Sequence, residues 1–448
     1  MSPTSRIGIR AEDKNIWERR VPLTPHAVMD LAEHGVEVWV ERFPRRAFLD
    51  EDYEAAGARM VDDVTPCELV LGIKEIPVEH FRRGSAYMFF SHTIKGQPHN
   101  MPMLQRLVEL GCTLFDYELV RDEAGRRLIF FGRYAGLAGM IDTLSVLGHR
   151  LEALGIASPF CEVDQTQLYA GLPDAREAVG RLAARIAGEG VPLQLAPLVV
   201  GFTGYGNVSS GAQEIFDLLP HVTVAPADLP AFVAQNPRLT KKLVKVVYHE
   251  CDLVQPIEAG HPFDLQEYFD HPERYHSTFD PHLDLLTVIV NGIYWTERYP
   301  RLATREQLAA RFAGNRRPRL LVVGDISCDV NGSLACTVRD TDPGHPAYVY
   351  DPLTGESPAG FEGRGVTVMA VYNLPCELPM EASAAFSTVL APFVPALAAC
   401  DLSAPFASAG LPPELERATI LWRGEFTPTY SYMREFLPRD IPREETIR

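Results

Sequence analysis

The sequence predicts an α/β fold of two Rossmann-like, doubly wound domains with a cleft between them, in which the C-terminal segment completes the first domain. Three observations favour this fold. Short apolar runs typical of buried strands alternate with helix-like segments along most of the chain. A glycine-rich turn near the middle joins one such run to a helical pattern, and 448 residues exceed the size of one ordinary core. We expect one domain at 1–140 and 370–448 and the other at 141–369.

The first half of the chain begins a series of strands and helices at residue 7. Thr24 and Pro25 fit the N-cap and the first position of a helix that ends before Gly35. Apolar runs rich in β-forming residues predict strands, and Gly111 closes a second helix. The predicted strands are 7–10, 37–41, 69–74, 87–91, 113–118 and 128–132, and the predicted helices are 25–34 and 101–110.

The second half repeats this alternation after a long helix at 135–154. The small and apolar residues of that helix indicate close packing on a neighbour and a bridge between the domains. A further helix is expected at 173–187, and another at 381–399 that packs back on the first domain. The predicted strands are 195–200, 222–225, 244–248, 286–291, 320–326 and 366–371.

Composition and charge exclude several classes of protein. With 46% hydrophobic and 23% charged residues, the chain is expected to be soluble and globular. Its net charge of −17 repels phosphate backbones, so we expect no nucleic-acid partner. The sequence has no uninterrupted apolar run of membrane-spanning length and no apolar signal core, which favours a cytoplasmic protein without a membrane partner. The eight cysteines never form C-x-x-C, and no metal site is predicted.

The most informative stretch is the glycine-rich turn Gly201-Phe-Thr-Gly-Tyr-Gly-Asn-Val-Ser-Ser-Gly-Ala212. A strand, a tight glycine turn and a helix N-terminus form the usual site for a dinucleotide pyrophosphate. Ser209 stands where the third glycine of G-x-G-x-x-G belongs, so a purely structural turn is an open alternative. Asp228 lies near the spacing of a ribose-binding acid, but Pro226 leaves its register open, and with it the choice between NAD and NADP.

Ionisable side chains follow three predicted strands of the first domain. Lys74 and Glu75 end one strand, His92 ends the next, and Glu118 ends a third. Because the carboxyl ends of parallel strands face the ligand crevice, these groups are expected to converge and to exchange protons with a substrate. The alternative is that they are surface residues at strand ends. Convergence predicts a cleft enzyme with its substrate on the first domain and its cofactor on the second.

Arginines near these strand ends are candidates for binding carboxylates. Arg20 could offer a planar fork that a lysine would not match. Arg126, Arg127 and Arg133 lie beside the third strand end, where a salt-bridged hairpin also explains them. The chain carries neither G-x-S-x-G nor a Walker loop, so acyl transfer and phosphoryl transfer lose their usual support.

Several segments, in order along nearly the whole chain, resemble the lysine-ketoglutarate reductase part of the aminoadipic semialdehyde synthases. More distantly, the chain is similar to lysine-forming saccharopine dehydrogenase, to alanine dehydrogenase and to the transhydrogenase domain. The matching segments are Glu18-Arg-Arg-Val-Pro-Leu-Thr-Pro25, Leu71-Gly-Ile-Lys-Glu75, Phe89-Phe-Ser-His-Thr-Ile-Lys-Gly-Gln97, Phe131-Gly-Arg-Tyr-Ala-Gly136, Gly204-Tyr-Gly-Asn-Val-Ser-Ser-Gly-Ala-Gln213, His271-Pro-Glu-Arg-Tyr275, Asn291-Gly-Ile-Tyr-Trp295, Gly324-Asp-Ile-Ser327 and Asn373-Leu-Pro375.

The resemblance implies an oxidoreductase of lysine degradation that condenses L-lysine with 2-oxoglutarate and reduces the imine with NADPH to give saccharopine. By motif position, Lys74 and His92 match the acid/base pair. The residues matched to the substrate are Glu18, Glu75 and Glu118, which would tune those groups or hold the lysine amine, and Arg20 and Arg127, which would bind carboxylates. Those matched to the cofactor are Gly204, Gly206, Asn207, Val208 and Ser209 at the pyrophosphate, and Asn291, Gly292, Asp325 and Ile326 near the ribose and nicotinamide.

The chain departs from the family pattern at three points. It ends near residue 448, so a separate saccharopine-cleaving dehydrogenase is expected in the pathway. Tyr372 stands where related sequences commonly carry aspartate, and Cys328 replaces a small alanine. The open alternatives are an NAD-dependent, lysine-forming saccharopine dehydrogenase that uses NADH, an opine or amino-acid dehydrogenase with another amine, and a regulatory protein that binds dinucleotide or lysine without catalysis.

Overall fold

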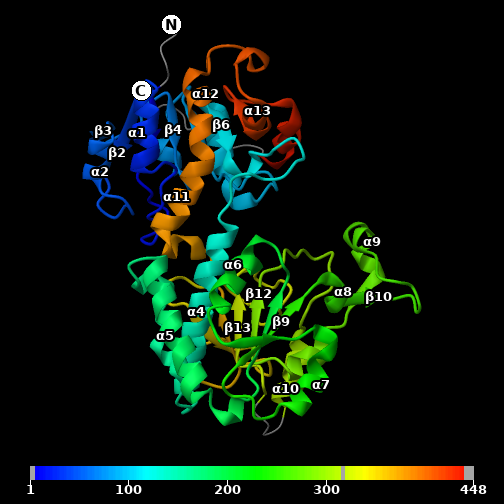
Figure 1. Ribbon diagram of the computed structural model, residues 1–448. Coiled ribbons are helices and arrows are strands. Elements are labelled where there is room, and N and C mark those ends of the chain that lie inside the picture. The colour runs from blue at the N-terminus through cyan, green and yellow to red at the C-terminus, as the bar shows by residue number, and fades with distance from the viewer. Residues whose placement is uncertain (1–5, 314–317, 438–448) are drawn as a thin grey trace. The chain divides into compact units, whose positions relative to one another are not determined.

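Each of two β-sheets forms the centre of its own unit of the chain. The computed structural model describes residues 6–313 and 318–437 and divides the chain into unit 1, Met1–Phe131 with Pro379–Arg448, and unit 2, Gly132–Leu378 (Figure 1). The predicted class is confirmed: both sheets are mainly parallel, and C-terminal residues complete the first unit. The substrate and dinucleotide roles expected of the two units stay predictions.

The sheet of unit 1 has the strand order β17-β16-β6-β5-β4-β1-β2-β3. The strands from β6 to β3 are parallel, whereas β16 runs antiparallel to β6 and β17 antiparallel to β16. The strands are β1 Ile7–Ile9, β2 Val38–Glu41, β3 Arg59–Val61, β4 Leu69–Leu71, β5 Ala86–Phe89, β6 Thr113–Asp116, β16 Thr419–Trp422 and β17 Glu425–Phe426. The central strands β1, β4, β5 and β6 are buried throughout, as expected of a parallel sheet that is covered on both faces.

Helices pack against this sheet as the sequence pattern indicates. The Thr24 hydroxyl caps the first helix by accepting a hydrogen bond from the Ala27 N–H at 3.4 Å, as its sequence position predicts. The helices of unit 1 are α1 Pro25–Glu33, α2 Asp50–Ala55, α3 Met101–Glu109, α11 Pro379–Leu390, α12 Val394–Ala399 and α13 Pro413–Ala418.

One predicted element of unit 1 is wrong and another is wrong in part. Residues 128–132 form no strand; the turn before them is closed by a single bridge between Arg121 and Arg127, and α4 starts at Gly132. The Phe131 ring instead stacks on Phe386 in the core, 5.0 Å between centroids. The predicted helix at 381–399 is interrupted by a 3-10 turn, Ala391–Phe393, because Pro392 has no N–H to donate to the preceding helical turn.

The segment Pro379–Ala399 is long and apolar enough to span a membrane by length and composition alone, and 44% of its most apolar 18-residue window is buried within the protein. Its packing in unit 1 explains its apolar character. The Ser383 and Ser387 hydroxyls accept hydrogen bonds from the N–H groups of Val21 and Thr24, which anchors α11 to the chain before α1.

The sheet of unit 2 has the order β14-β15-β13-β12-β7-β9-β8, with only β14 antiparallel to its neighbour. Its strands are β7 Val199–Thr203, β8 His221–Thr223, β9 Leu243–Tyr248, β12 Val288–Asn291, β13 Val322–Asp325, β14 Ala347–Tyr350 and β15 Val366–Met369, and the strands β10 Val254–Pro256 and β11 Tyr275–Ser277 form a separate antiparallel pair. Its helices are α4 Gly132–Ala153, α5 Leu172–Glu189, α6 Asn207–Phe216, α7 Leu229–Gln235, α8 Glu250–Leu253, α9 Leu265–Asp270 and α10 Arg305–Phe312.

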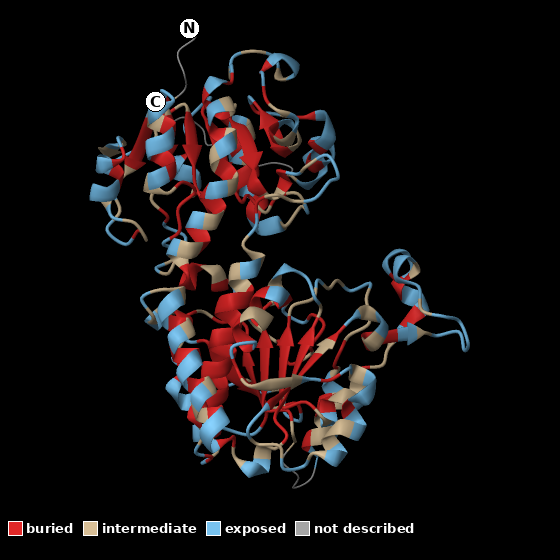
Figure 2. Cartoon of the chain, viewed as in Figure 1, coloured by how far each residue is buried: buried red, intermediate tan, exposed pale blue. Residues whose placement is uncertain are grey.

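The long helix α4 is a core element of unit 2. Figure 2 shows it and the central strands largely buried, with exposed residues on the outer helices. Small residues let α4 approach α6 closely: a Cβ on Gly136 would collide with the Val208 carbonyl, and one on Gly211 with the Arg133 carbonyl. The packing on a neighbour that we predicted for this helix is therefore confirmed, and the neighbour is the helix that follows the glycine turn.

Candidate functional site

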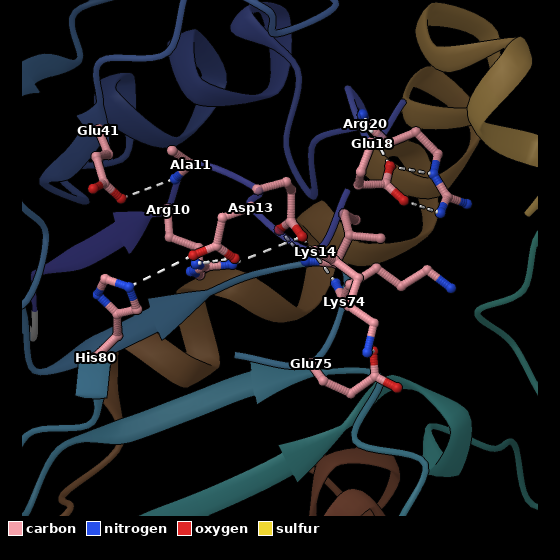
Figure 3. A network of polar contacts seen from close by, with 12 residues as sticks. Arg10, Ala11, Asp13, Lys14, Glu18, Arg20, Glu41, Lys74, Glu75 and His80 are labelled. Atoms are coloured by element: carbon pink, nitrogen blue, oxygen red, sulfur yellow. Dashed lines mark hydrogen bonds and ion pairs between the residues drawn. The ribbon is translucent and has the colours of Figure 1, made fainter. Parts of the chain in front are cut away.

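The carboxyl edge of the unit 1 sheet brings ionisable side chains together. The neighbouring parallel strands β4 and β5 are followed by Glu75 and His92, and the His92 Nδ1 lies 2.7 Å from the Glu75 Oε1. Lys14, in the loop after β1, places its Nζ 3.6 Å from the other Glu75 oxygen (Figure 3). The predicted convergence therefore exists for Glu75 and His92.

Glu75 is held in its ionised form. Burial of the carboxyl acts to raise its pKa, but the hydrogen bond and the charge of His92 outweigh burial, with a further contribution from Lys14, and the pKa falls to about 2. His92 has a positive φ of 49°, an uncommon conformation for a residue other than glycine. Such local strain is typical of functional positions, where the surrounding structure enforces it.

Glu12, which is 2% exposed, holds the backbone of the segment that carries Lys74. The two Glu12 oxygens accept hydrogen bonds from the backbone N–H groups of Ile73 at 2.6 Å and of Lys74 at 3.1 Å. Burial raises the pKa of Glu12 to about 7, and the nearby Arg10 opposes this rise. Lys74 belongs to the polar network drawn in Figure 3, together with Lys14, Glu75 and the Glu18–Arg20 pair.

The Arg20 fork that we predicted to bind a substrate carboxylate faces a carboxylate of the chain itself. Its Nε lies 2.8 Å from the Glu18 Oε1 and its Nη2 lies 2.6 Å from the Glu18 Oε2, and both side chains are buried. The guanidinium also lies 4.2 Å from the centroid of the Phe131 ring. Glu18 and Arg20 thus form a bidentate pair, and a substrate carboxylate would have to compete with Glu18 for that fork.

Glu118 and Arg127 form an ion pair. The Arg127 Nη1 lies 3.4 Å from the Glu118 Oε1, and its Nε donates to the Ile129 carbonyl at 2.7 Å. The guanidinium lies 5.4 Å from the centroid of the Phe90 ring, and the Phe90 ring stacks on His92 at 6.1 Å. This contact chain connects the third predicted strand end to the histidine.

Lys14 and Glu12 were missed by the sequence analysis. Both lie in the loop after β1, and β1 pairs in parallel with β4, so the two loops share one edge of the sheet. The rule that we applied to the ends of β4, β5 and β6 would have found both residues had it been applied to β1 as well.

The glycine turn of unit 2 has the geometry predicted for it. β7 ends at Thr203, Gly204 adopts a φ of 84°, and α6 begins at Asn207 after the N-cap Gly206. Ser209 is buried and its hydroxyl accepts a hydrogen bond from Gln213. The displaced glycine, Gly211, serves the contact with α4 described above. Val208, Ser209 and Gly292 lie together, because a Cβ on Gly292 would be 3.3 Å from the Ser209 nitrogen.

Asn291 and Asp325 form a buried network at the carboxyl ends of three neighbouring strands. The Asn291 amide donates to the Asp325 Oδ1 at 2.9 Å and accepts from the Thr203 hydroxyl at 2.6 Å. The Thr337 hydroxyl donates to the other Asp325 oxygen, and burial raises the pKa of Asp325 to about 6. These side chains are engaged with one another, and Ile326 follows them with its N–H bonded to the Asn291 carbonyl.

The strand order does not place Asp228 beside the glycine turn. Asp228 is exposed and follows β8, the edge strand, whereas β9 lies between β8 and β7. Spacing along the sequence alone made Asp228 a candidate for contact with the ribose. Here the chain passes to the sheet edge first and returns to pair β9 with β7.

The site residues predicted from the sequence form two sets, one in each unit. Lys74, Glu75, His92, Glu118 and the Glu18–Arg20 pair belong to unit 1, and the glycine turn and the Asn291–Asp325 network belong to unit 2. Within residues 6–313 and 318–437, no group of three or more His, Cys, Asp or Glu side chains is placed to hold a metal ion.

Part of the chain matches a family model, and most of it is similar to known proteins. The family model of the alanine dehydrogenase/PNT N-terminal domain matches residues 8–138, which is most of the N-terminal part of unit 1. An alpha-aminoadipic semialdehyde synthase of Arabidopsis thaliana is 38% identical over 444 residues, which cover 95% of this chain and 41% of that protein. Over this length the chain is similar to alpha-aminoadipic semialdehyde synthases. It spans less than half of the length of that relative.

Two further likenesses extend the comparison. An NAD(+)-dependent, L-lysine-forming saccharopine dehydrogenase of Yarrowia lipolytica is 27% identical over 403 residues, which cover 88% of this chain and 92% of that protein. A solved L-alanine dehydrogenase has a TM-score of 0.61 at 19% identity and covers 97% of this chain and all of its own. That structural likeness confirms the two-domain fold expected from the sequence.

Proposed function

We propose that this protein is a nicotinamide-dependent oxidoreductase that condenses L-lysine with 2-oxoglutarate and reduces the product to saccharopine. The observation that carries the proposal is the group of Lys74, Glu75 and His92 at the carboxyl edge of the unit 1 sheet, in a chain similar to the semialdehyde synthases. The Yarrowia relative is a dehydrogenase by name, and a glycine turn of the dinucleotide-binding type supports the coenzyme.

The reaction requires proton transfer at several steps. The lysine ε-amine attacks the keto carbon of 2-oxoglutarate, and the keto oxygen takes up a proton to give a carbinolamine. Loss of that oxygen as water leaves an imine. A bound reduced nicotinamide supplies the hydride that converts the imine carbon to the saccharopine C–H. Each proton step needs an acid or a base close to the nitrogen or oxygen concerned.

Lys74 and His92 are the residues that we assign to these proton transfers. Because the His92 Nδ1 is held by Glu75, the Nε2 is the ring nitrogen left to exchange a proton with the substrate. Ionised Glu75 orients that ring through the hydrogen bond to Nδ1. Glu12 holds the backbone of Lys74 and so fixes the position from which its amine acts.

The net negative charge of the chain opposes the binding of substrate carboxylates, so local cations are needed to hold them. We propose Arg127 for one of them: its guanidinium is paired with Glu118 at the long distance of 3.4 Å, which leaves it more available than Arg20 at 2.6 Å from Glu18. Saccharopine is long and carries three carboxylates. The guanidinium groups of Arg20 and Arg127, at separate points, would fix its position along the site.

A steady-state assay tests the proposal. Oxidation of NADH and of NADPH is followed by absorbance while L-lysine and 2-oxoglutarate are each omitted in turn, and saccharopine is identified by mass spectrometry. We expect oxidation only when both substrates are present. Oxidation that proceeds with 2-oxoglutarate and another amine but not with lysine would instead support an opine-type dehydrogenase.

The reverse direction has its own support, because the Yarrowia relative that is matched over 92% of its length is named as lysine-forming. The same equilibrium runs both ways, so the assay is repeated with saccharopine and oxidised coenzyme. Initial rates in the two directions, measured at one pH and at the same set of substrate concentrations, show which direction is faster under those conditions.

A further inference from the structure

The loop after β9 lies directly beside the glycine turn. β9 pairs in parallel with β7, with Thr203 opposite Tyr248, and the Gly204 N–H donates to the Tyr248 carbonyl at 3.1 Å. The first residues after β9 are His249 and Glu250, which begins α8. In doubly wound folds, the strand next to the glycine-turn strand ends in the residue that contacts the adenosine ribose of the coenzyme. In this chain that strand is β9.

Tyr205, in the middle of the glycine turn, holds this loop. Its ring stacks on His249, with 4.4 Å between centroids and 27° between planes, and its hydroxyl lies in the electrostatic field of the Glu250 carboxylate. The negative charge of Glu250 raises the pKa of Tyr205 accordingly. Glu250 is half-buried, whereas the other carboxylate of the loop, Asp252, accepts the His249 N–H at 2.9 Å and caps α8. Glu250 is thus the carboxylate of this loop that contacts the glycine turn.

The two segments around Glu250 carry no lysine or arginine in the sequence. The sequence has no lysine or arginine from Ile186 to Pro237, a range that includes β7, the glycine turn, α6 and β8. It has none from Val246 to Glu273, a range that includes the end of β9, α8 and β10. An enzyme that uses NADP places an arginine near the ribose to accommodate the 2′-phosphate. Both segments that approach the ribose position lack such a cation, and Glu250 would repel the phosphate.

We infer that Glu250 determines coenzyme choice in this protein, by accepting a hydrogen bond from the ribose 2′-hydroxyl of NADH and excluding the 2′-phosphate of NADPH, with Tyr205 as its positioning residue. This inference rests on the proposed function only in requiring that a nicotinamide dinucleotide binds at the glycine turn. It departs from the NADPH that the family resemblance implies, and it replaces Asp228 with a residue on the strand that the sheet places next to β7.

Direct binding of the two coenzymes tests the inference without substrates. NADH and NADPH are titrated by calorimetry into the full chain and into Glu250→Gln, Glu250→Arg, Asp228→Asn and Glu258→Gln, each checked for folding by circular dichroism. We expect the wild type to bind NADH about tenfold or more tighter than NADPH, in line with one hydrogen bond to a charged group. Glu250→Gln keeps an acceptor but loses the charge, so its NADPH affinity should rise about tenfold while its NADH affinity changes little.

Glu250→Arg should reverse the preference, and Glu258→Gln, an exposed carboxylate beyond β10, should leave the ratio unchanged. Tyr205→Phe should reduce the NADH preference in part, because it removes the hydroxyl that interacts with Glu250 but keeps the ring on His249. Equal or stronger binding of NADPH by the wild type would overturn the inference and leave the proposed function standing. A ratio that responds to Asp228→Asn rather than to Glu250→Gln would also overturn it. Binding of neither coenzyme would overturn both the inference and the proposed function.

Discussion

Glu75 connects two side chains that come from different loops of unit 1. His92 follows β5 and Lys14 follows β1, and both contact the Glu75 carboxylate. With a pKa of about 2, this carboxylate stays ionised at every pH at which the enzyme would operate. The positive charge of Lys14 is therefore partly balanced at this edge of the sheet.

Replacing Lys74 tests its assignment as an acid/base group. Lys74→Met keeps the length of the side chain and removes the amine, so kcat should fall by about a hundredfold to ten-thousandfold. The measurement is the steady-state rate of coenzyme oxidation with L-lysine and 2-oxoglutarate. Lys241→Met, an exposed lysine before β9 in unit 2, is the matched control and should keep wild-type turnover. Wild-type turnover in Lys74→Met would contradict the assignment.

At the scale of elements, the loops after β1 and β4 are joined by one buried carboxylate. Glu12 accepts the N–H groups of Ile73 and Lys74, so the chain after β4 cannot shift without breaking these bonds. Glu12 holds a proton in the folded protein between about pH 4.5 and 7, where the same group in the unfolded chain is ionised. The folded state then binds more protons, and stability decreases as pH rises through this window.

Glu12→Gln should remove this part of the pH dependence. Urea unfolding of the wild type and of the variant at pH 5 and pH 8 gives four free energies of unfolding. The loss of stability from pH 5 to pH 8 should be smaller in the variant by up to about 3 kcal/mol, from a pKa that rises by some two to three units. Any pH-independent effect of the substituted amide on stability cancels, because each protein is compared with itself at pH 5 and pH 8. An equal loss in both proteins would show that Glu12 does not titrate in this range.

Close contact between α4 and α6 is a second property of elements. A Cβ on Gly136 would collide with backbone atoms of α6, so Gly136→Ala should lower the free energy of unfolding by about 1–3 kcal/mol. Gly188→Ala lies in α5, where no atom is within 4 Å of the new Cβ, and it should stabilise the protein by about 0.5–1 kcal/mol. Thermal melts of both variants give the comparison, and a Gly136→Ala melt that matches the wild type would exclude tight packing at this position.

For the whole molecule, alternation of strands and helices sufficed to predict the class and most elements. Strand order in unit 2 could not be predicted, because β8 and β9 both follow α6 and only tertiary packing decides which one pairs with β7. Spacing along the sequence alone made Asp228 the candidate rather than Glu250.

The candidate site of unit 1 was also predicted only in part. His92 and Glu75 follow neighbouring strands, and the rule for strand ends was enough to bring them together. The Glu18–Arg20 pair was not foreseen, since nothing in two residues separated by one position shows that both side chains will be buried against each other.

The central claim is that the two substrates are joined and reduced at the carbon that was the keto carbon of 2-oxoglutarate. The most direct measurement uses reduced coenzyme carrying deuterium at the transferable position of the nicotinamide, together with L-lysine and 2-oxoglutarate, and analyses the product by NMR. We predict saccharopine with one deuterium on the glutaryl carbon bonded to the lysine ε-nitrogen. A product without deuterium at that carbon, or coenzyme oxidation without a lysine–glutarate adduct, would contradict the account.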